Sequence, residues 1–275
     1  MHRITKSNFP GLDWDAVRPF KSEYTCLWFT CPQRAKPGQY IETQSSNRSA
    51  IIMTGNDKEW VILFAKHTSR SGDNQKYSLD ELERFAASFA ELPTSLGESV
   101  GDMFARRITA GMTDLDEGIV EHWYSGRMVL VGDACHKMTP NAGIGFNSGV
   151  QDVAVLCNNL RQLIKDSPTS VPRSDAITNA FEKYQLTREA PARQDVSFSM
   201  HLTRLQAWAS LTYWLLAYWV LSYSFVKRLL AHYVCSGYSK GEVICYIPAK
   251  DLFSGSVPWV NTMPPNNGQP NSKKR

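Results

Sequence analysis

Residues 132–152 read GDACHKMTPNAGIGFNSGVQD, and no other segment says as much about how the chain folds. The apolar run at 127–131 predicts a buried strand, and the glycine-rich turn that follows predicts a helix beginning at about Gly145. Backbone N–H groups and the positive end of the dipole at a helix N-terminus favour an electron-rich or anionic group. Asp133, at the end of the predicted strand, can accept hydrogen bonds from sugar-type hydroxyls. The segment therefore predicts a cofactor-binding site rather than a catalytic triad.

This segment resembles the second flavin-binding motif of FAD-dependent monooxygenases of the aromatic-hydroxylase type. It is most similar to the version in fungal epoxidases of meroterpenoid, indole-diterpene and polyene natural-product pathways. The resemblance implies that Asp133 holds the ribityl chain of FAD and that the turn at 140–145 lies along the isoalloxazine ring. The cofactor-binding residues it implies are Gly132, Asp133, Pro140, Asn141, Gly143, Gly145, Phe146 and Asn147. Phe146 departs from the family pattern, which often has a small residue at that position.

Two other motifs of that family do not occur in the sequence. There is no G-x-G-x-x-G, the motif that cradles the FAD pyrophosphate, and no Asp-Gly pair before an arginine-rich segment. The chain is therefore expected to correspond to the C-terminal portion of such an enzyme. The predicted fold class is α+β: a partial flavin-monooxygenase fold with an antiparallel substrate-domain sheet, the later part of the FAD domain, and a C-terminal hydrophobic helix.

The resemblance, together with composition and pattern, implies four parts of the chain. They are a substrate-binding sheet domain at 1–118, the remainder of the FAD-binding domain at 119–200, a hydrophobic membrane-associating helical tail at 201–255, and a disordered C-terminus at 256–275.

Local patterns predict the elements inside these parts. Aromatic and branched residues predict strands, and helical spacing with an N-cap at Ser78 predicts the first helix. The predicted strands are 24–31, 49–54, 60–65, 121–124 and 127–131, and the turn residues at 55–57 predict a hairpin of the second and third strands. The predicted helices are 79–90, 145–164 and 175–193. In the last helix, Tyr184, Arg188 and Pro191 resemble a Tyr-x-x-x-Arg-x-x-Pro pattern of the same monooxygenases.

The tail contains 22 residues, 205–226, without a charged side chain. At about 1.5 Å per residue, this run is long enough to cross a hydrocarbon core of about 30 Å. Gln206 and Ser210 lower its apolarity, and its aromatic residues are spread along its length, as in a helix that lies in the membrane interface. A spanning helix, an interfacial helix and a soluble packing helix all stay open. The expected localisation is intracellular and membrane-associated, with the endoplasmic reticulum as a candidate.

Charge and cysteine usage exclude some classes of protein. The chain of 275 residues has 30 basic and 26 acidic side chains, and no basic stripe interleaved with aromatic residues, so no nucleic-acid partner is expected. The six cysteines form no C-x-x-C pair, which favours a reducing compartment. Histidines are scattered, and Cys135 and His136 are adjacent rather than spaced as ligands, so no metal is expected.

Two functions remain open from the sequence. The first is an FAD-dependent monooxygenase, an epoxidase or hydroxylase, that acts on a lipophilic polyene or prenylated intermediate in fungal secondary metabolism, with NADPH or NADH as reductant. The second is a non-catalytic remnant or auxiliary subunit that works with a full-length homologue or with pathway enzymes. No catalytic side chain is assigned, because flavin chemistry belongs to the cofactor. His136 is expected to be a hydrogen-bonded structural residue, and Cys135 a small core residue.

Overall fold

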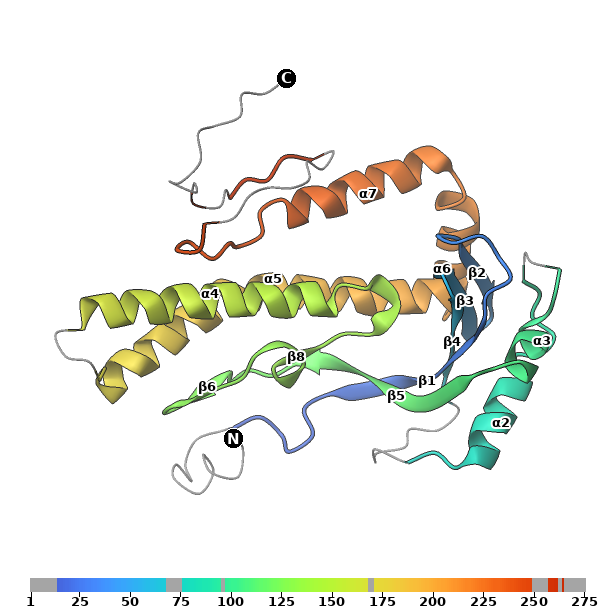
Figure 1. Cartoon of the computed structure of the whole chain (residues 1–275), viewed down its shortest axis with the longest axis horizontal. Helices are drawn as coiled ribbons and strands as arrows, with labels where there is room; N and C mark the ends of the chain where they lie inside the picture. The colour runs from blue at the N-terminus through green and yellow to red at the C-terminus, as the bar shows by residue number, and fades with distance from the viewer. Residues whose placement is uncertain are drawn as a thin grey trace.

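A computed structural model describes residues 14–67, 76–94, 97–167, 171–248, 257–261 and 264 (Figure 1). Its centre is a six-stranded sheet in the order β2-β3-β4-β1-β5-β8, with every neighbouring pair antiparallel. The strands are β1 (Lys21–Pro32), β2 (Tyr40–Ser45), β3 (Arg48–Thr54), β4 (Lys58–Lys66), β5 (Thr109–Ile119) and β8 (His136–Lys137). The predicted antiparallel sheet is confirmed, including the strand at 24–31 and the hairpin of β3 and β4.

One face of the sheet carries the main hydrophobic core. It packs against α2 (Leu79–Ala87) and α3 (Val100–Ala105), which lie together on the same side of the sheet (Figure 1). Five of the fully buried residues of this core are Leu27, Phe29, Ile52, Leu63 and Phe89. Burial of such side chains stabilises the fold by about 1.5–3 kcal/mol each.

Helix α2 begins where the sequence predicts. The Ser78 hydroxyl accepts a hydrogen bond from the Glu81 backbone N–H, and the Glu81 carboxylate accepts one from the Ser78 N–H. The helix ends at Ala87, earlier than the predicted Ala90. The Ser88 hydroxyl donates to the Phe85 carbonyl at 2.6 Å, which gives the last turn an alternative to the helical pattern.

A buried carboxylate ties this core to the loop after β1. Glu59 is fully buried and accepts hydrogen bonds from the backbone N–H groups of Arg34 and Ala35, both at 2.9 Å, and from Arg106 Nη2 at 2.8 Å. Burial alone would raise the pKa of the Glu59 carboxyl, but these hydrogen bonds hold it below its ordinary value. Glu59 is therefore ionised and needs its cationic partner.

The second half of the chain is helical. Helix α4 (Gly145–Asp166) confirms the predicted helix, and α5 (Ser174–Gln206) packs along it (Figure 1). Helix α5 is longer than predicted and continues through Pro191, which costs it one backbone hydrogen bond. The predicted strands at 121–124 and 127–131 are mostly wrong.

Only β6 (Tyr124–Ser125) and β7 (Met128–Val129) form in that region, and among the described residues they pair with each other. Strand propensity needs a partner edge to become a sheet. Here α4 and α5 cover the segment instead, so Val129 and Leu130 pack against a helical core.

The predicted hydrophobic helix at 205–226 is also wrong, because the chain bends twice within it. Helix α5 ends at Gln206, Trp208 has a φ of 44°, and the Ser210 hydroxyl caps a new helix by accepting from the Tyr213 N–H. The pieces that follow are α6 (Leu211–Leu215), the π-helix η3 (Leu216–Val220) and α7 (Ser224–Tyr238). None of the helices in the described ranges combines the length and apolarity needed to span a bilayer. The expected disordered C-terminus lies mostly outside the described residues.

Replacement of Arg106 by Met should lower the free energy of unfolding by roughly 3 kcal/mol, because it leaves the buried Glu59 carboxylate without its cation. The matched change Arg193→Met removes the exposed pair with Glu189 and should cost less than about 1 kcal/mol. Urea denaturation followed by circular dichroism measures both variants. Equal losses would contradict the role given to Glu59.

Candidate cofactor site

The loop that carries the sequence motif is held against the first turns of α4. Gly132 has a φ of 60°, a conformation that favours glycine, and opens the short 3-10 helix η1 (Gly132–Ala134). A Cβ atom on Gly149 would lie 3.6 Å from the Cα of Gly132, so the loop and the helix touch through two residues without side chains. The positive φ accounts for glycine at position 132, whereas a Cβ atom on Gly149 would make only an ordinary van der Waals contact.

A buried ion network fastens the same loop. The Asp152 carboxylate, fully buried, accepts hydrogen bonds from the Gly132 N–H at 2.9 Å and from His136 Nε2 at 2.7 Å on one oxygen. Its other oxygen accepts from Arg188 Nε at 2.7 Å. The Arg188 Nη2 group also donates to the hydroxyl and the carbonyl oxygen of Ser148. One carboxylate thus joins the loop, β8, α4 and α5.

The partners of Asp152 in this network favour the ionised form of its carboxyl group. Burial alone would raise the pKa of the Asp152 carboxyl, but hydrogen bonds from His136 and Arg188 outweigh it and hold the pKa below its ordinary value. His136 is 1% exposed and bonds to Asp152, so it acts in the structure as a positioning residue for the loop, as the sequence predicts. Arg188, whose pattern is weak in the sequence, is the network's cation.

The ligand atoms of Cys135, His136 and Asp152 lie within 4.8 Å of one another. Both oxygens of Asp152 already accept hydrogen bonds, one of them from a guanidinium, and a second cation beside Arg188 would be repelled. Burial raises the pKa of the Cys135 thiol to about 12, so it is protonated and a poor metal ligand. The cluster is better suited to hold the loop than to bind a metal ion.

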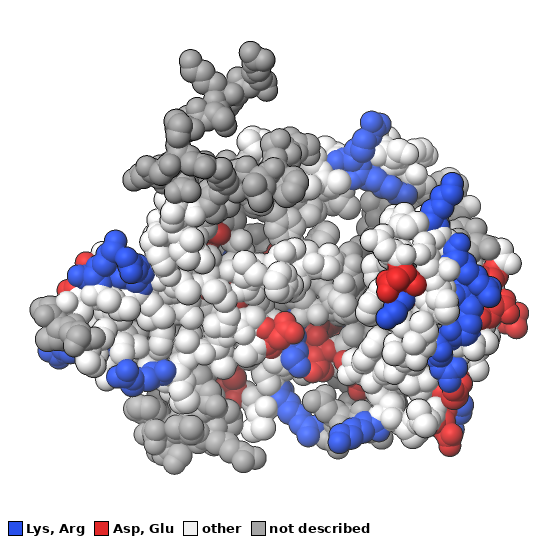
Figure 2. Space-filling model, in the orientation of Figure 1, with Lys and Arg blue, Asp and Glu red and all other residues white. Residues whose placement is uncertain are grey.

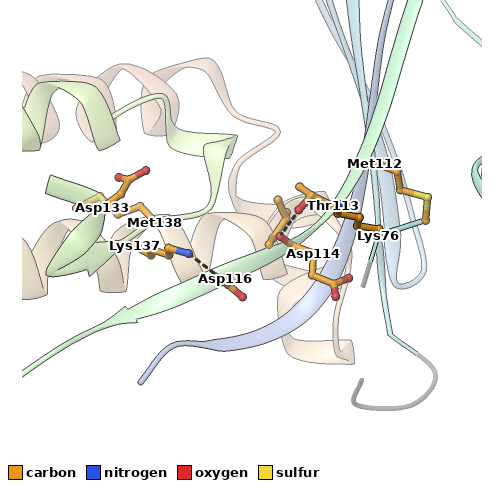
Figure 3. A pocket seen from close by; sticks show the side chains of 9 residues that line it. Lys76, Met112, Thr113, Asp114, Asp116, Asp133, Lys137 and Met138 are labelled. Carbon is orange, nitrogen blue, oxygen red and sulfur yellow. Dashed lines mark hydrogen bonds and ion pairs between the residues drawn. The ribbon is translucent and has the colours of Figure 1, made fainter. Parts of the chain in front are cut away.

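Asp133 lies at the edge of a cavity of about 540 Å³ between this loop and β5 (Figure 3). Its side chain is exposed, whereas its neighbours Cys135 and His136 are buried. Lys137 Nζ donates to Asp116 Oδ2 at 2.8 Å and so joins the two walls. The cavity is lined by Lys76, Met112, Thr113, Asp114, Leu115, Asp116, Asp133, Lys137 and Met138.

The turn after Asp133 ends in an open helix N-terminus. The 3-10 helix η2 (Pro140–Ala142) is followed by Gly143 with a φ of 65°, and α4 then begins without a side-chain cap. A Cβ atom on Gly143 or Gly145 would meet no atom of the structure within 4 Å, and Phe146 is 83% exposed. Helix α4 therefore begins without a side-chain cap and with free space beside Gly143 and Gly145, and an electron-rich group is favoured at such a helix N-terminus.

Hydrogen bonds with side chains of α5 fix this turn. The Thr139 hydroxyl lies 2.7 Å from that of Ser199 and 2.6 Å from that of Thr203, all three buried. Asn141 Nδ2 donates to Gln206 Oε1 at 2.7 Å, and the buried Asn141 Oδ1 has no hydrogen-bond partner in the described structure. An acceptor with no donor is a site where a bound molecule can complete the hydrogen bonding.

The structure thus places the eight predicted cofactor residues in one segment, which runs from the loop with Asp133 through the turn to the N-terminus of α4. Sequence reasoning missed Asp152 as the organiser of this loop and missed Gln206, Thr203 and Asp116 as its distant partners. The Tyr-x-x-x-Arg-x-x-Pro pattern was the one local signal for the network. The other partners come from segments far away in the sequence, which no local spacing connects.

An exposed carboxylate, an uncapped helix N-terminus and two glycines without neighbours fit a flavin with a ribityl chain. Solved structures share this fold: HpxO of Klebsiella pneumoniae, in complex with FAD and uric acid, has a TM-score of 0.58 over 78% of this chain and 52% of that one, at 14% identity. A salicylate hydroxylase substrate complex has a TM-score of 0.57 over 80% and 55%, at 14% identity. At this identity the likeness concerns the fold alone.

A family model described as an FAD binding domain matches residues 20–179, and the chain belongs to that family. Curated relatives include the FAD-dependent monooxygenase SAT1 of Stachybotrys chartarum, 37% identical over 191 residues, 69% of this chain and 65% of the relative. The FAD-dependent monooxygenase penE of Penicillium thymicola is 29% identical over 254 residues, 90% of this chain and 53% of the relative. The chain spans about half the length of the curated relatives it matches.

Replacement of Arg188 by Met should lower the free energy of unfolding by about 3–5 kcal/mol at neutral pH, because it leaves the Asp152 carboxylate buried without its cation. Thermal and urea unfolding measure the loss. The conservative variant Arg188→Lys keeps the charge but loses the fork of donors, so it should recover part of the stability.

The pH dependence of the stability distinguishes an ionic role of Arg188 from a role in packing alone. The pKa of Asp152 is lowered in the folded state, so its stabilising contribution is complete above the unfolded value of about 3.9 and is lost as the pH falls through the folded value. The stability difference between wild type and Arg188→Met should shrink below about pH 4. A difference that stays constant down to acid pH would show that Arg188 acts through packing only.

Proposed function

We propose that this chain is part of an FAD-dependent monooxygenase, an epoxidase or hydroxylase, that acts on a lipophilic polyene or prenylated intermediate of fungal secondary metabolism. The observation that carries the proposal is the open N-terminus of α4 beside the exposed Asp133, on a loop fixed by Asp152. Relatives named as fungal FAD-dependent monooxygenases support it. In such a reaction NADPH or NADH supplies two electrons, one oxygen atom of O₂ enters the substrate and the other leaves as water.

The residues have distinct roles in this proposal. Asp133 would accept hydrogen bonds from the ribityl hydroxyls, and Pro140, Asn141 and Gly143 would help to hold the flavin ring. The N–H groups of Gly145, Phe146 and Asn147, at the uncapped start of α4, would stabilise negative charge on the flavin. The bound flavin supplies the activation of dioxygen, whereas the protein orients the substrate and excludes water.

The substrate class is inferred from the face of the sheet opposite α2 and α3. Tyr40, Met53 and Trp60 are cross-strand neighbours on this face and are 55%, 37% and 49% exposed. Trp28 lies two residues along β1 from Thr30, the partner of Trp60, and is therefore on the same face. A row of large apolar side chains open to solvent suits an extended apolar molecule.

Two features connect this aromatic row to the cofactor turn. Gln206 accepts from Asn141 and donates to Glu42 Oε2 at 2.9 Å on β2, so one side chain bridges the turn and the sheet. A Cβ atom on Gly111 would lie 2.3 Å from the Trp28 ring, so only glycine lets this indole pack against β5, which forms one wall of the cavity. Both features support a substrate held between the aromatic row and the flavin.

Asp133→Ala should weaken binding of FAD by at least about tenfold, since charge-assisted hydrogen bonds contribute about 1.5–3 kcal/mol. Asp166→Ala, at the exposed end of α4, should bind FAD as the wild type does. Flavin fluorescence titration of the folded proteins measures both. Equal affinities in wild type and Asp133→Ala would refute the ribityl contact, and undetectable FAD binding by the wild type would favour an auxiliary, non-catalytic protein.

Trp60→Ala should raise the Kd of a farnesylated phenol about tenfold or more while leaving FAD affinity unchanged, because burial of an indole against a ligand contributes more than about 1.4 kcal/mol. Trp259→Ala removes an equally exposed indole away from the sheet and serves as control. Equilibrium dialysis measures the ligand, and product mass after reaction with isotope-labelled O₂ tests turnover. An unchanged Kd in Trp60→Ala would exclude the aromatic row as the substrate surface.

A further inference from the structure

The segment that follows α5 exposes a large apolar surface. Eleven of its side chains are between 40% and 77% exposed. They define a tail surface made of Leu211, Leu215, Leu216, Tyr218, Trp219, Val220, Tyr223, Phe225, Leu229, Leu230 and Tyr233. Monomeric soluble proteins rarely leave so many large apolar side chains of one segment in water, and such patches mark interaction sites.

The apolar residues of this surface follow helical spacing. Leu211, Leu215 and Trp219 recur every four residues along α6 and η3, and Phe225, Leu229 and Tyr233 do so along α7. Each helical piece therefore presents an apolar stripe. Tryptophan and tyrosine are interleaved with leucine, a mixture that suits a boundary between hydrocarbon and water.

The charge around this surface has one sign. No aspartate or glutamate occurs between Asp195 and Glu242, whereas Lys227, Arg228 and Lys240 do. Lys227 and Arg228 are exposed in the middle of the tail surface. In Figure 2, basic side chains and no acidic ones stand on the upper edge of the molecule, where α7 runs in Figure 1. This charge complements anionic headgroups.

The tail surface is anchored to the sheet at one end and to α4 at the other. At its start, Trp208 Nε1 donates to Gln44 Oε1 at 2.7 Å on the sheet. After α7, the Glu242 backbone N–H donates to the side chain of Gln151, and Asn158 Nδ2 donates to the Val243 carbonyl at 2.8 Å. Gln151 and Asn158 belong to α4, so whatever the tail surface binds is held beside the helix that begins at the cofactor turn.

We propose that α6, η3 and α7 form a docking surface for an anionic lipid bilayer. The apolar stripes enter the boundary between headgroups and acyl chains, and Lys227 and Arg228 contact the anionic headgroups. The helical pieces lie in the membrane interface. The break at Trp208 separates them from α5, and the break at Tyr223 separates η3 from α7, so these short helices can follow the membrane plane. Docking places the cofactor loop next to the phase in which lipophilic molecules dissolve.

The test is flotation of the full chain with vesicles of phosphatidylcholine alone or with phosphatidylserine. The wild type should float with the anionic vesicles, and its binding should fall with added salt. The combined change Leu215→Ser, Trp219→Ser and Leu229→Ser should reduce vesicle affinity at least tenfold. A matched triple, Val153→Ser, Ile164→Ser and Leu186→Ser, removes exposed apolar side chains of α4 and α5 and should bind as the wild type does.

If the variant with three apolar replacements does not fold, a second variant still tests the proposal. Lys227→Glu with Arg228→Glu alters only exposed charges and should abolish the preference for phosphatidylserine. The proposal is overturned if the wild type stays with the unbound fraction, or if the matched triple loses as much affinity as the tail triple. Light scattering supplies a further check of the oligomeric state. If the wild type is a dimer and the tail triple variant is a monomer, the tail surface binds a second copy of the chain and not a bilayer.

Discussion

The buried carboxylate of Asp152 is the contact on which the cofactor loop depends. It bonds to the Gly132 backbone, to His136 on β8 and to Arg188 on α5, so the motif loop and the distant helix α5 meet at two oxygen atoms of α4. A carboxylate without water is tolerated only when it is fully paired. The geometry of the loop, and with it the exposure of Asp133, follows from that requirement.

The same physical rule operates in the sheet half of the chain. Glu59, also fully buried, uses two backbone N–H groups and Arg106 to fix the loop after β1. Two paired carboxylates thus fix one loop in each half of the chain. The cavity at β5 and the aromatic row on the sheet are where a flavin and an apolar substrate meet in the proposed function.

Much of the local structure could be predicted because the signals are local. The Ser78 and Glu81 capping pair, the hairpin of β3 and β4, and the start of α4 at Gly145 depend on residues a few positions apart. The run at 127–131 failed as a strand because a strand also needs a partner edge. The run at 205–226 failed as one helix because Ser210 caps a new helix and Trp208 takes a positive φ, effects that hydropathy does not register.

The sequence by itself determined the FAD-binding motif at 132–152, the residues that its resemblance assigns to the cofactor, and the uncharged, aromatic character of the tail. Only the tertiary structure decided that Asp152 organises the motif, that Gln206 joins the cofactor turn to the sheet, and that the tail is a surface of short helices. The physical reason is that motif residues act on a ligand through local backbone geometry, whereas their supports are chosen by which distant side chains the packing of α4, α5 and the sheet brings within hydrogen-bond distance.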